Sequence, residues 1–344
     1  MATMNTLSGH IFECLGANNF RIIPNDWLLP KDKILLRPIS VGICSSDYSR
    51  LFDGSGHTYP ITLGHEIYAE VVANSSTLDF LQGERVAVFP LIPCKACENC
   101  SNLKYNLCEN YSYLGSREAG ALGSFLIVSP WQLKKIPYEL PNRVGNQIEP
   151  LSVVNHAFNG FSNLVKDSKL LLTGTGFLTF LAIQVALLRG ISKITVISNN
   201  DWGSLFLRKY CTVVTHEQIG KVNFDKCIDF SGNYQTLDRI TSSIKVKGEI
   251  ILVANKRSDT YISSHSWDKI LRKEIILKGS WNSSFLGSTS EDDWSLSIAQ
   301  LIDSHIKDEY PHKEILLTDL PKYLLSVKNP GVSSIKHRLS VNVD

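Results

Sequence analysis

Four of the eight cysteines lie close together, between Leu91 and Glu109, with the spacing C-x2-C-x2-C-x7-C. Short gaps let neighbouring thiolates turn toward one point, and a later fourth thiolate completes the tetrahedron that zinc prefers. Because the protein fills all four positions, such a site has no place for water or substrate, and we interpret it as structural. An iron–sulfur cluster is the main alternative, and disulfides are disfavoured because nothing in the sequence indicates secretion. The cysteines are Cys94, Cys97, Cys100 and Cys108.

The composition is typical of a globular protein that acts on a small molecule. The chain has 344 residues, enough for two domains with separate cores, and 43% of the residues are hydrophobic. The net charge of +2 gives no reason to expect binding to nucleic acid or to an acidic membrane surface. The N-terminal residues lack a signal-peptide pattern and no apolar run is long enough to span a bilayer, so we expect a cytoplasmic protein.

The pattern of hydrophobic residues changes at about residue 150. Before that point, short apolar or alternating runs are separated by Gly and Pro, which predicts a mostly-β domain. After it, strand-length and helix-length apolar runs alternate, which predicts a parallel sheet covered by helices. The tail, 334–344, ends as a strand that we expect to return to the first domain. The expected elements are strands at 169–172, 193–197, 226–229 and 249–253 and helices at 177–188, 202–210 and about 237–244.

Cysteine, histidine and glutamate also occur in three stretches that suit a second, open metal site. These are Cys44-Ser45-Ser46-Asp47, Gly64-His65-Glu66 and Ile148-Glu149-Pro150. A catalytic zinc ion keeps about three protein ligands and leaves one position for water or substrate, where it lowers the pKa of an alcohol. Ser46 is close enough in sequence to Cys44 to pass on the hydroxyl proton, and Asp47 is placed to accept the spare N–H of His65. Each residue alone has an ordinary structural interpretation, but together they favour a metal site.

A strand, a glycine turn and an apolar helix are expected at 169–184. Gly174 and Gly176 permit a tight turn and let backbone N–H groups approach a pyrophosphate at the helix N-terminus. The full dinucleotide-binding pattern has a third glycine where this chain has Thr179. The next strand ends at Ser198, without the acid that binds the ribose of NAD and without an adjacent base for the phosphate of NADP. Asp201 is an alternative ribose ligand, so the sequence leaves NAD and NADP open.

These residues together resemble the zinc-dependent medium-chain alcohol and polyol dehydrogenase family. The stretches GICSSD, PITLGHE and QIEPLSVVNHAF are similar to the three ligand segments of the family, and the cysteine cluster is similar to its structural zinc lobe. Glutamate at position 149 resembles the polyol branch. Likeness to the polyol-phosphate members of that branch is carried by RLFDGSGHTYPITLGHE, LIPCKACENC, YLGSREAG and KILRKEIILKGSW.

The resemblance implies a GroES-like catalytic domain at 1–150 with its zinc lobe at about 91–109, a Rossmann domain at 151–290, and a return to the catalytic domain at 291–344. It implies hydride transfer between a secondary alcohol and a nicotinamide, in a homodimer or homotetramer. Cys44, His65 and Glu149 would bind the catalytic zinc, with Glu66 as an alternating or water-bridged ligand. Ser46 would begin the proton relay.

The substrate-binding residues are less constrained by the sequence. Arginine binds phosphate in bidentate fashion, so Arg50 and Arg117 are candidates for contacting a phosphorylated polyol. His57, in a glycine-rich loop, and Trp281, where the family chain passes near the nicotinamide, are further candidates. Each has the alternative interpretation of a surface or packing residue. For the whole chain, the alternatives are a dehydrogenase of a free sugar alcohol or other biosynthetic secondary alcohol, and a non-catalytic relative with a decayed cofactor site.

Overall fold

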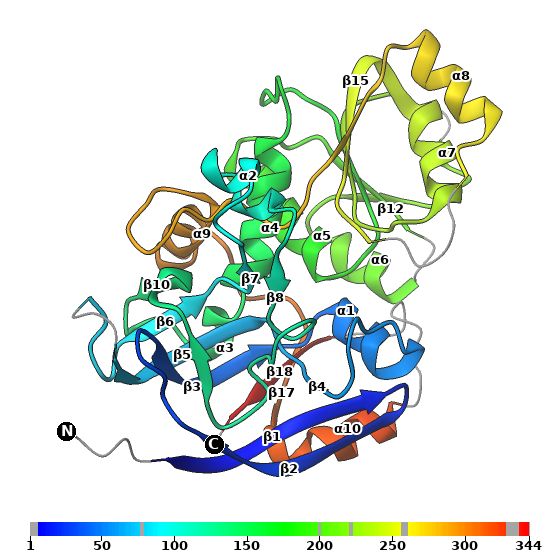
Figure 1. Ribbon diagram of the computed structural model, residues 1–344. Coiled ribbons are helices and arrows are strands. Elements are labelled where there is room, and N and C mark those ends of the chain that lie inside the picture. Colours follow the sequence, from blue (N-terminus) through cyan, green and yellow to red (C-terminus); the bar gives the residue numbers. More distant parts are fainter. Residues whose placement is uncertain are drawn as a thin grey trace. The chain divides into compact units, whose positions relative to one another are not determined.

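The computed structural model describes residues 6–75, 79–198, 201–219, 223–255, 261–327 and 337–343, without the side chains of Asp201, Trp202 and Tyr234. The chain forms two compact units (Figure 1). The expected fold class, a mostly-β GroES-like domain with a parallel-sheet Rossmann domain, is confirmed by the sheets of the two units. Unit 1 comprises Met1–Ser152, Ser284–Ser304 and Asp308–Asp344, and unit 2 comprises Val153–Ser283 and His305–Lys307.

Unit 1 is built from two main sheets around one hydrophobic core. In the first sheet, β2 (Asn19–Trp27), β1 (Leu7–Gly16) and β4 (Ile61–Thr62) are neighbours. The second sheet has the order β10-β6-β5-β3-β18-β17, and β9 also pairs with β3. Its strands are β3 (Ile34–Gly42), β5 (Glu66–Asn74), β6 (Arg85–Val88), β9 (Leu126–Val128), β10 (Leu133–Ile136), β17 (His312–Leu316) and β18 (Arg338–Asn342).

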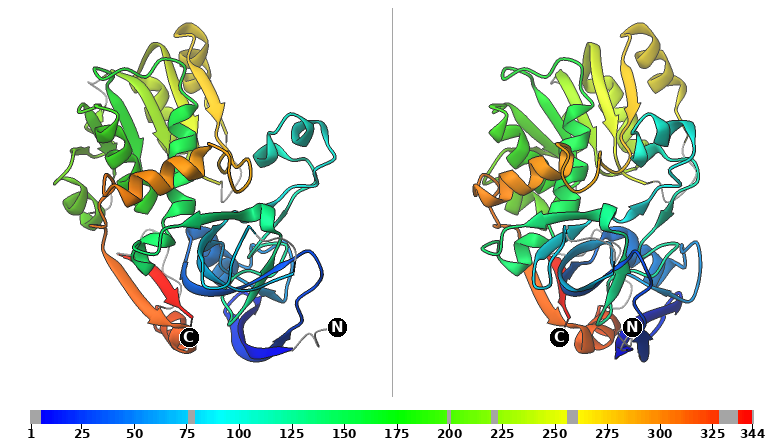
Figure 2. Two further views of the ribbon diagram at one scale, coloured as in Figure 1. Left: turned by 90° about the vertical axis from the view of Figure 1, so that its left-hand side faces the viewer. Right: turned by 60° about the vertical axis from the view of Figure 1, so that its left-hand side comes forward.

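The last strand, β18, pairs with strands of unit 1. This strand runs antiparallel to β3, with Ser340 opposite Gly42, and parallel to β17. Figure 2 shows β17 and β18, in orange and red, side by side. Because Leu339 and Val341 are buried in the core of unit 1, the last strand stabilises the domain that the first strands begin.

Short elements carry the cysteine lobe and the segment that follows β3. β7 (Leu91–Ile92) pairs with β8 (Ser112–Tyr113), and α2 (Glu98–Ser101) and a 3-10 turn at Tyr105–Leu107 lie between them in sequence. After β3, α1 (Ser45–Tyr48) continues into a π-helix at Ser49–Asp53. Single π turns are rare and occur often at functional sites. The remaining described helices outside the parallel sheet are α3 (Asn142–Gly145), α4 (Ile148–Asn159), α9 (Asp293–Ile302) and α10 (Leu320–Ser326), with 3-10 turns at Pro130–Gln132 and Leu317–Asp319.

Unit 2 contains a six-stranded parallel sheet with the order β13-β12-β11-β14-β15-β16. The order reverses between β11 and β14, so right-handed crossovers place α5 and α6 on one face and α7 and α8 on the other, as Figure 1 shows. All four residues of β11 are buried, which explains the unbroken apolar run in the sequence. The elements are β11 (Leu170–Thr173), α5 (Phe177–Leu188), β12 (Ile194–Ile197), α6 (Asp201–Leu207), β13 (Thr212–Val214), β14 (Phe224–Asp229), α7 (Tyr234–Ser243), β15 (Ile244–Leu252), α8 (Ser264–Arg272) and β16 (Ile276–Gly279).

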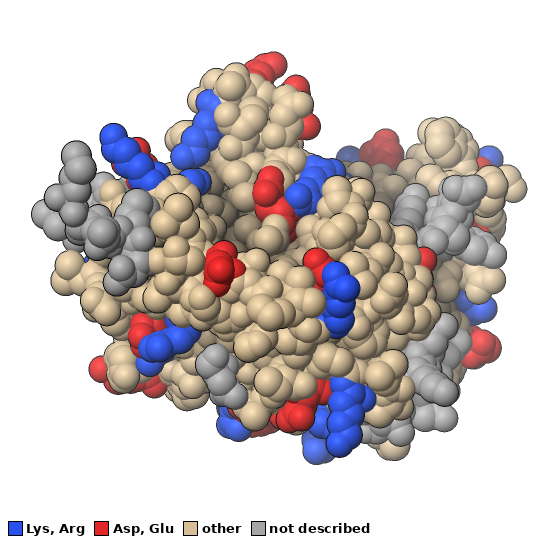
Figure 3. All heavy atoms as spheres, turned by 60° about the horizontal axis from the view of Figure 1, so that its bottom comes forward, with Lys and Arg blue, Asp and Glu red and all other residues tan. Residues whose placement is uncertain are grey.

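Two features of the structure concern possible partners: the distribution of surface charge and the character of the helices. On the face drawn in Figure 3, acidic and basic side chains are intermixed and form no large patch of one sign. None of the described helices has both the length and the apolar character needed to cross a bilayer.

An aromatic cluster joins the lobe to the core of unit 1. Phe89 stacks on Phe285 with ring centroids 4.5 Å apart, and the edge of Trp294 meets both rings at 5.6 Å. Trp131 packs edge-on against Phe89 and Phe285, and against Tyr105 of the lobe at 5.0 Å. The rings bury a large apolar surface, and their edge-to-face geometry adds to that stabilisation.

Because the side chain of Trp294 is fully buried, Trp294→Ala should lower the free energy of unfolding by about 3–5 kcal/mol. Trp267→Ala is the matched control, since this indole is 65% exposed, and it should change the same quantity by less than about 0.5 kcal/mol. Urea titrations followed by far-ultraviolet circular dichroism measure both variants. Equal effects would contradict the packing described for Trp294.

Candidate metal centres and active site

The four clustered cysteines converge on one point. Their sulfur atoms lie within 4.8 Å of one another, with Cys97 Sγ 3.9 Å from Cys108 Sγ and Cys94 Sγ 4.0 Å from Cys100 Sγ. A tetrahedron with metal–sulfur distances of about 2.3 Å has edges of about 3.8 Å, so a single zinc ion fits between these sulfurs. An iron–sulfur cluster would place several atoms there and hold the sulfurs further apart. All eight cysteines are free thiols, as expected from the sequence.

Backbone amides favour charge on part of this cluster. The N–H of Ala96 donates to Cys94 Sγ at 3.5 Å, and the N–H of Cys94 donates to Cys108 Sγ at 3.2 Å. Donation by the amides of Ala96 and Cys97 lowers the pKa of the Cys94 thiol to about 6, whereas burial raises the pKa of Cys100 to about 12. Four sulfurs this close cannot all ionise by themselves, and a shared cation would allow them to do so.

A second group of ligand atoms is assembled by the pairing of β3 with β5. Gly42, at the end of β3, lies opposite Glu66, at the start of β5. Cys44 follows β3 by two residues and His65 immediately precedes β5, so antiparallel pairing brings both to the same end of the sheet. The ligand atoms of Cys44, His65 and Glu66 lie within 4.8 Å of one another, a donor set that suits zinc. The three residues therefore come together because of the register between β3 and β5.

Asp47 lies behind these ligands and holds two of them. Its side chain is fully buried; Oδ2 accepts from the backbone N–H of Cys44 at 3.0 Å, and Oδ1 lies 3.5 Å from His65 Nδ1. This contact places the carboxylate of Asp47 on the Nδ1 side of the imidazole, and Nε2 is the other ring nitrogen that could bind a metal. Burial opposes ionisation of Asp47, but His65 and Arg50 outweigh it and hold the pKa of this carboxyl below its ordinary value. Asp47 and His65 therefore lie side by side, and the hydrogen bond expected between them stays a prediction.

Glu66 has a buried cationic partner that the sequence did not reveal. Nη2 of Arg338 donates to Glu66 Oε2, to the backbone oxygen of Asn146 and to Asn146 Oδ1, each at 2.7 Å. A Cβ on Gly42 would lie 2.1 Å from Glu66 Oε2, so only glycine fits beside this pair. Arg338 is 272 positions away in sequence, on β18, and no local pattern marks it. Only the pairing of β18 with β3 places it here.

Glu149 lies beside the three clustered ligands but is not one of them. It is buried near the start of α4, and Tyr113 Oη donates to its Oε1 at 3.5 Å. Burial raises the pKa of Glu149 to about 7, which His65 opposes and Glu66 reinforces. The ring of Tyr113 also meets His65 edge-on, with centroids 5.7 Å apart. Sequence reasoning missed Tyr113, although its position five residues after Cys108 placed it at the exit of the lobe.

The predicted substrate residues fall into three environments. Nη1 of Arg50 donates to Ser46 Oγ at 2.9 Å and to Asp47 Oδ1 at 3.4 Å. Arg117 stacks on the ring of Tyr111 at 4.3 Å and donates to its backbone oxygen. The side chain of His57 is exposed, and its pKa is lowered by partial burial and by the charges of Arg117 and Arg50. Trp281 belongs to unit 2 and is 38% exposed.

The glycine turn of unit 2 has the geometry expected of a nucleotide-binding loop. Gly174 follows β11 with a φ of +83°, and Gly176 is the N-cap of α5, where a Cβ would meet nothing within 4 Å. Thr179 replaces the third glycine and is buried, with its hydroxyl donating to the backbone oxygen of Thr173 at 3.3 Å. Ser198 is buried just after β12. Asn199, Asn200 and the side chain of Asp201 lie outside the described residues.

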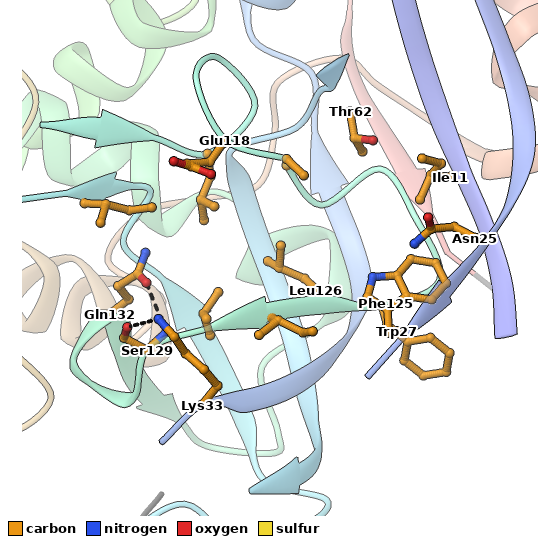
Figure 4. Close-up of a pocket in the computed structure, with 16 residues that line it drawn as sticks. Ile11, Asn25, Trp27, Lys33, Thr62, Glu118, Phe125, Leu126, Ser129 and Gln132 are labelled. Atoms are coloured by element: carbon orange, nitrogen blue, oxygen red, sulfur yellow. Dashed lines mark hydrogen bonds between the residues drawn. The ribbon is translucent and has the colours of Figure 1, made fainter. Parts of the chain in front are cut away.

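A separate cavity of about 510 Å³ lies in unit 1. Trp27, Phe125 and Leu126 line one part of it, and Lys33 and Gln132 line another (Figure 4). Lys33 Nζ donates to Ser129 Oγ at 2.8 Å in the same region. The cavity is large enough for a small molecule, but none of the residues predicted for metal, cofactor or substrate lines it.

Comparisons with known proteins agree with the geometry. Residues 30–138 match a family described as the alcohol dehydrogenase GroES-like domain. Galactitol 1-phosphate 5-dehydrogenase of Escherichia coli (strain K12) is 29% identical over 264 residues, covering 73% of this chain and 76% of that protein. D-arabitol-phosphate dehydrogenase of Enterococcus avium is 26% identical over 311 residues, covering 82% and 84%. The crystal structure of galactitol-1-phosphate dehydrogenase from Escherichia coli shares the fold, with a TM-score of 0.86 and 23% identity over 97% of this chain and 99% of that chain.

The two clusters predict two zinc ions per chain with different roles. Cys97→Ala should lose one ion and lower the melting temperature, because metal binding at a closed site contributes folding free energy. Cys44→Ala should lose the other ion and keep most of the stability. Plasma mass spectrometry and thermal unfolding measure the two properties. Cys211→Ala, outside both clusters, is the control and should retain both ions; iron in place of zinc, or a fully stable Cys97 variant, would contradict this assignment.

Proposed function

We propose that this chain is a member of the zinc-dependent medium-chain alcohol and polyol dehydrogenases, and that it transfers a hydride between a secondary alcohol of a polyol or polyol phosphate and a nicotinamide cofactor. The proposal is supported by the match of residues 30–138 to the alcohol dehydrogenase GroES-like domain and by the likeness to the two polyol-phosphate dehydrogenases described above. The observation that supports this most directly is the group formed by Cys44, His65 and Glu66, with Asp47 behind it. Three protein ligands of these types leave a position for a substrate oxygen.

Different residues of this chain would have different roles in such a reaction. A zinc ion, when bound, supplies Lewis acidity that lowers the pKa of the alcohol. Cys44, His65 and either Glu66 or Glu149 would hold it, and Asp47 fixes the orientation of His65. Ser46, two residues after Cys44 and partly exposed, would accept the alcohol proton as hydride leaves the neighbouring carbon.

The cofactor would bind to unit 2. The turn of Gly174 and Gly176 presents backbone N–H groups at the N-terminus of α5, where a pyrophosphate is favoured by the exposed amides and the helix dipole. Ser198 and Asp201 follow β12, at the place that distinguishes NAD from NADP. We leave this choice to the activity screen below, with both cofactors as candidates.

A phosphorylated polyol is the substrate class that we favour over a free sugar alcohol. The two curated relatives described above are named as acting on galactitol 1-phosphate and D-arabitol phosphate. In this chain, the positive charge of Arg117 lowers the pKa of His57, and guanidinium groups suit phosphate oxygens. A free polyol or another secondary alcohol is the alternative, and in that case these two residues are surface residues.

We further propose a cytoplasmic homodimer, or a homotetramer built from such dimers. β16 is the last strand in the sheet order of unit 2, and on its outer side the described residues provide no pairing strand. Ile276 on this strand is 48% exposed. An exposed sheet edge pairs readily with a second copy about a two-fold axis.

Ile276→Lys, which places a charge on this edge, should shift the enzyme toward monomers in sedimentation velocity. Lys278→Arg is the control on the same strand and should leave the assembly unchanged. A wild-type monomer at all concentrations tested would refute the proposed assembly.

The substrate proposal is tested by a turnover screen. Galactitol, sorbitol and pentitols, with and without a terminal phosphate, are each assayed with NAD and with NADP. We expect a higher kcat/KM for a phosphorylated polyol, and Arg117→Gln should lower that value by about tenfold while changing kcat/KM for the free polyol little. Arg37→Gln, at an exposed ion pair, is the control. Activity confined to free polyols would reject the phosphate preference, and no turnover with any substrate would reject the proposed function.

A further inference from the structure

Arg50 is placed directly behind the hydroxyl of Ser46. It lies in the π-helix Ser49–Asp53, and Nη1 donates both to Ser46 Oγ at 2.9 Å and to Asp47 Oδ1 at 3.4 Å. Its side chain is 13% exposed and that of Asp47 is fully buried. The backbone is fixed as well, because Tyr59 Oη donates to the backbone oxygen of Arg50 at 2.8 Å and accepts from the N–H of Gly56 at 3.0 Å.

This arrangement is poorly explained by stability alone. Nε of Arg50 is buried and has no hydrogen-bond partner among the described residues. Burying a guanidinium with an unsatisfied donor is unfavourable, and an apolar side chain of similar size would often be as stable at such a place. A buried cation that is only partly satisfied, in a π turn next to a candidate active site, therefore indicates a functional constraint.

The contact with Arg50 determines how the Ser46 hydroxyl can be used. A hydroxyl has one proton and two lone pairs, and a guanidinium has donors but no acceptor. Arg50 therefore occupies one lone pair of Ser46 and cannot receive its proton. In the described part of the chain, the Ser46 hydroxyl has no other hydrogen-bond partner, and Ser46 is partly exposed while Asp47 behind it is buried. The free lone pair and the proton of Ser46 are left for the accessible side.

We propose that Arg50 is a positioning residue that orients the Ser46 hydroxyl for proton exchange with the substrate; this rests on the proposed function. In alcohol oxidation, the substrate O–H bond breaks and its proton binds the free lone pair of Ser46. Ser46 releases its own proton to solvent water, and the hydride leaves for the nicotinamide. In carbonyl reduction, the same transfers run in reverse. Arg50 keeps its charge throughout and exchanges no proton.

A double-mutant cycle separates this role from a structural or substrate-binding one. Arg50→Met should lower kcat about tenfold or more, because a misaligned hydroxyl loses part of the proton-transfer contribution, and KM should change little. In the Ser46→Ala background, Arg50→Met should lower kcat little further, since the contribution of Arg50 to proton transfer is made through Ser46. Arg50→Lys, which retains a donor, should recover part of kcat. Arg37→Met is the matched control at an exposed ion pair.

Two measurements besides turnover keep the test interpretable. Zinc content and nicotinamide affinity, the latter by fluorescence titration, should be unchanged in every variant. If Arg50→Met fails to fold, the cycle is read with Arg50→Lys instead. The inference would be overturned if Arg50→Met lowered kcat by the same factor in the wild-type and Ser46→Ala backgrounds. It would also be overturned if Arg50→Met raised KM for a phosphorylated polyol and left kcat unchanged. A wild-type enzyme without turnover overturns the proposed function, and this inference with it, whereas the other two outcomes overturn the inference alone.

Discussion

The buried carboxylate of Asp47 is the interaction on which the rest of the candidate site depends. An ionised carboxylate is costly inside a protein unless donors surround it. Here the donors are the backbone N–H of Cys44, the imidazole of His65 and the guanidinium of Arg50. Satisfying this one charge therefore joins α1 to the start of β5, aligns two candidate metal ligands, and places Arg50 under the hydroxyl of Ser46. The candidate site is organised around the carboxylate of Asp47, which is not itself one of the candidate metal ligands.

Local patterns predicted much of this structure, and long-range pairing accounts for most of what they missed. The helix expected at 177–188 is α5, Phe177–Leu188, because a largely apolar segment of helical length between glycines has few alternatives. The four cysteines converge because their ligands are local in sequence. Arg338 and Asn146 depend instead on the register of β18 against β3, which brings the ends of the chain together. No periodicity within either segment encodes that contact.

Thr179 illustrates how a departure from a motif can preserve its physical purpose. The third glycine of the dinucleotide-binding pattern allows a helix to pack closely on the preceding strand. In this chain the threonine is buried and its hydroxyl donates to the backbone oxygen of Thr173. The side chain therefore lies between α5 and β11 and joins them by a hydrogen bond. Loss of glycine at this position is therefore weak support for a decayed cofactor site. The positive φ of Gly174, which the turn itself requires, is kept.

The charges around the open site bear on which glutamate balances a divalent ion. Glu66 pairs with Arg338, and Asp47 pairs with Arg50 and lies beside His65. Both carboxylates therefore already have cationic or polar N–H partners. Glu149 is buried with the hydroxyl of Tyr113 at 3.5 Å, and burial raises its pKa to about 7. A Zn²⁺ ion bound by Cys44 and Glu149 would favour the ionised form of both side chains. Glu66 belongs to the cluster of ligand atoms and is hydrogen-bonded to Arg338, whereas Glu149 lies beside the cluster with the hydroxyl of Tyr113 as its partner, so the two glutamates would meet a bound ion in different states of charge compensation.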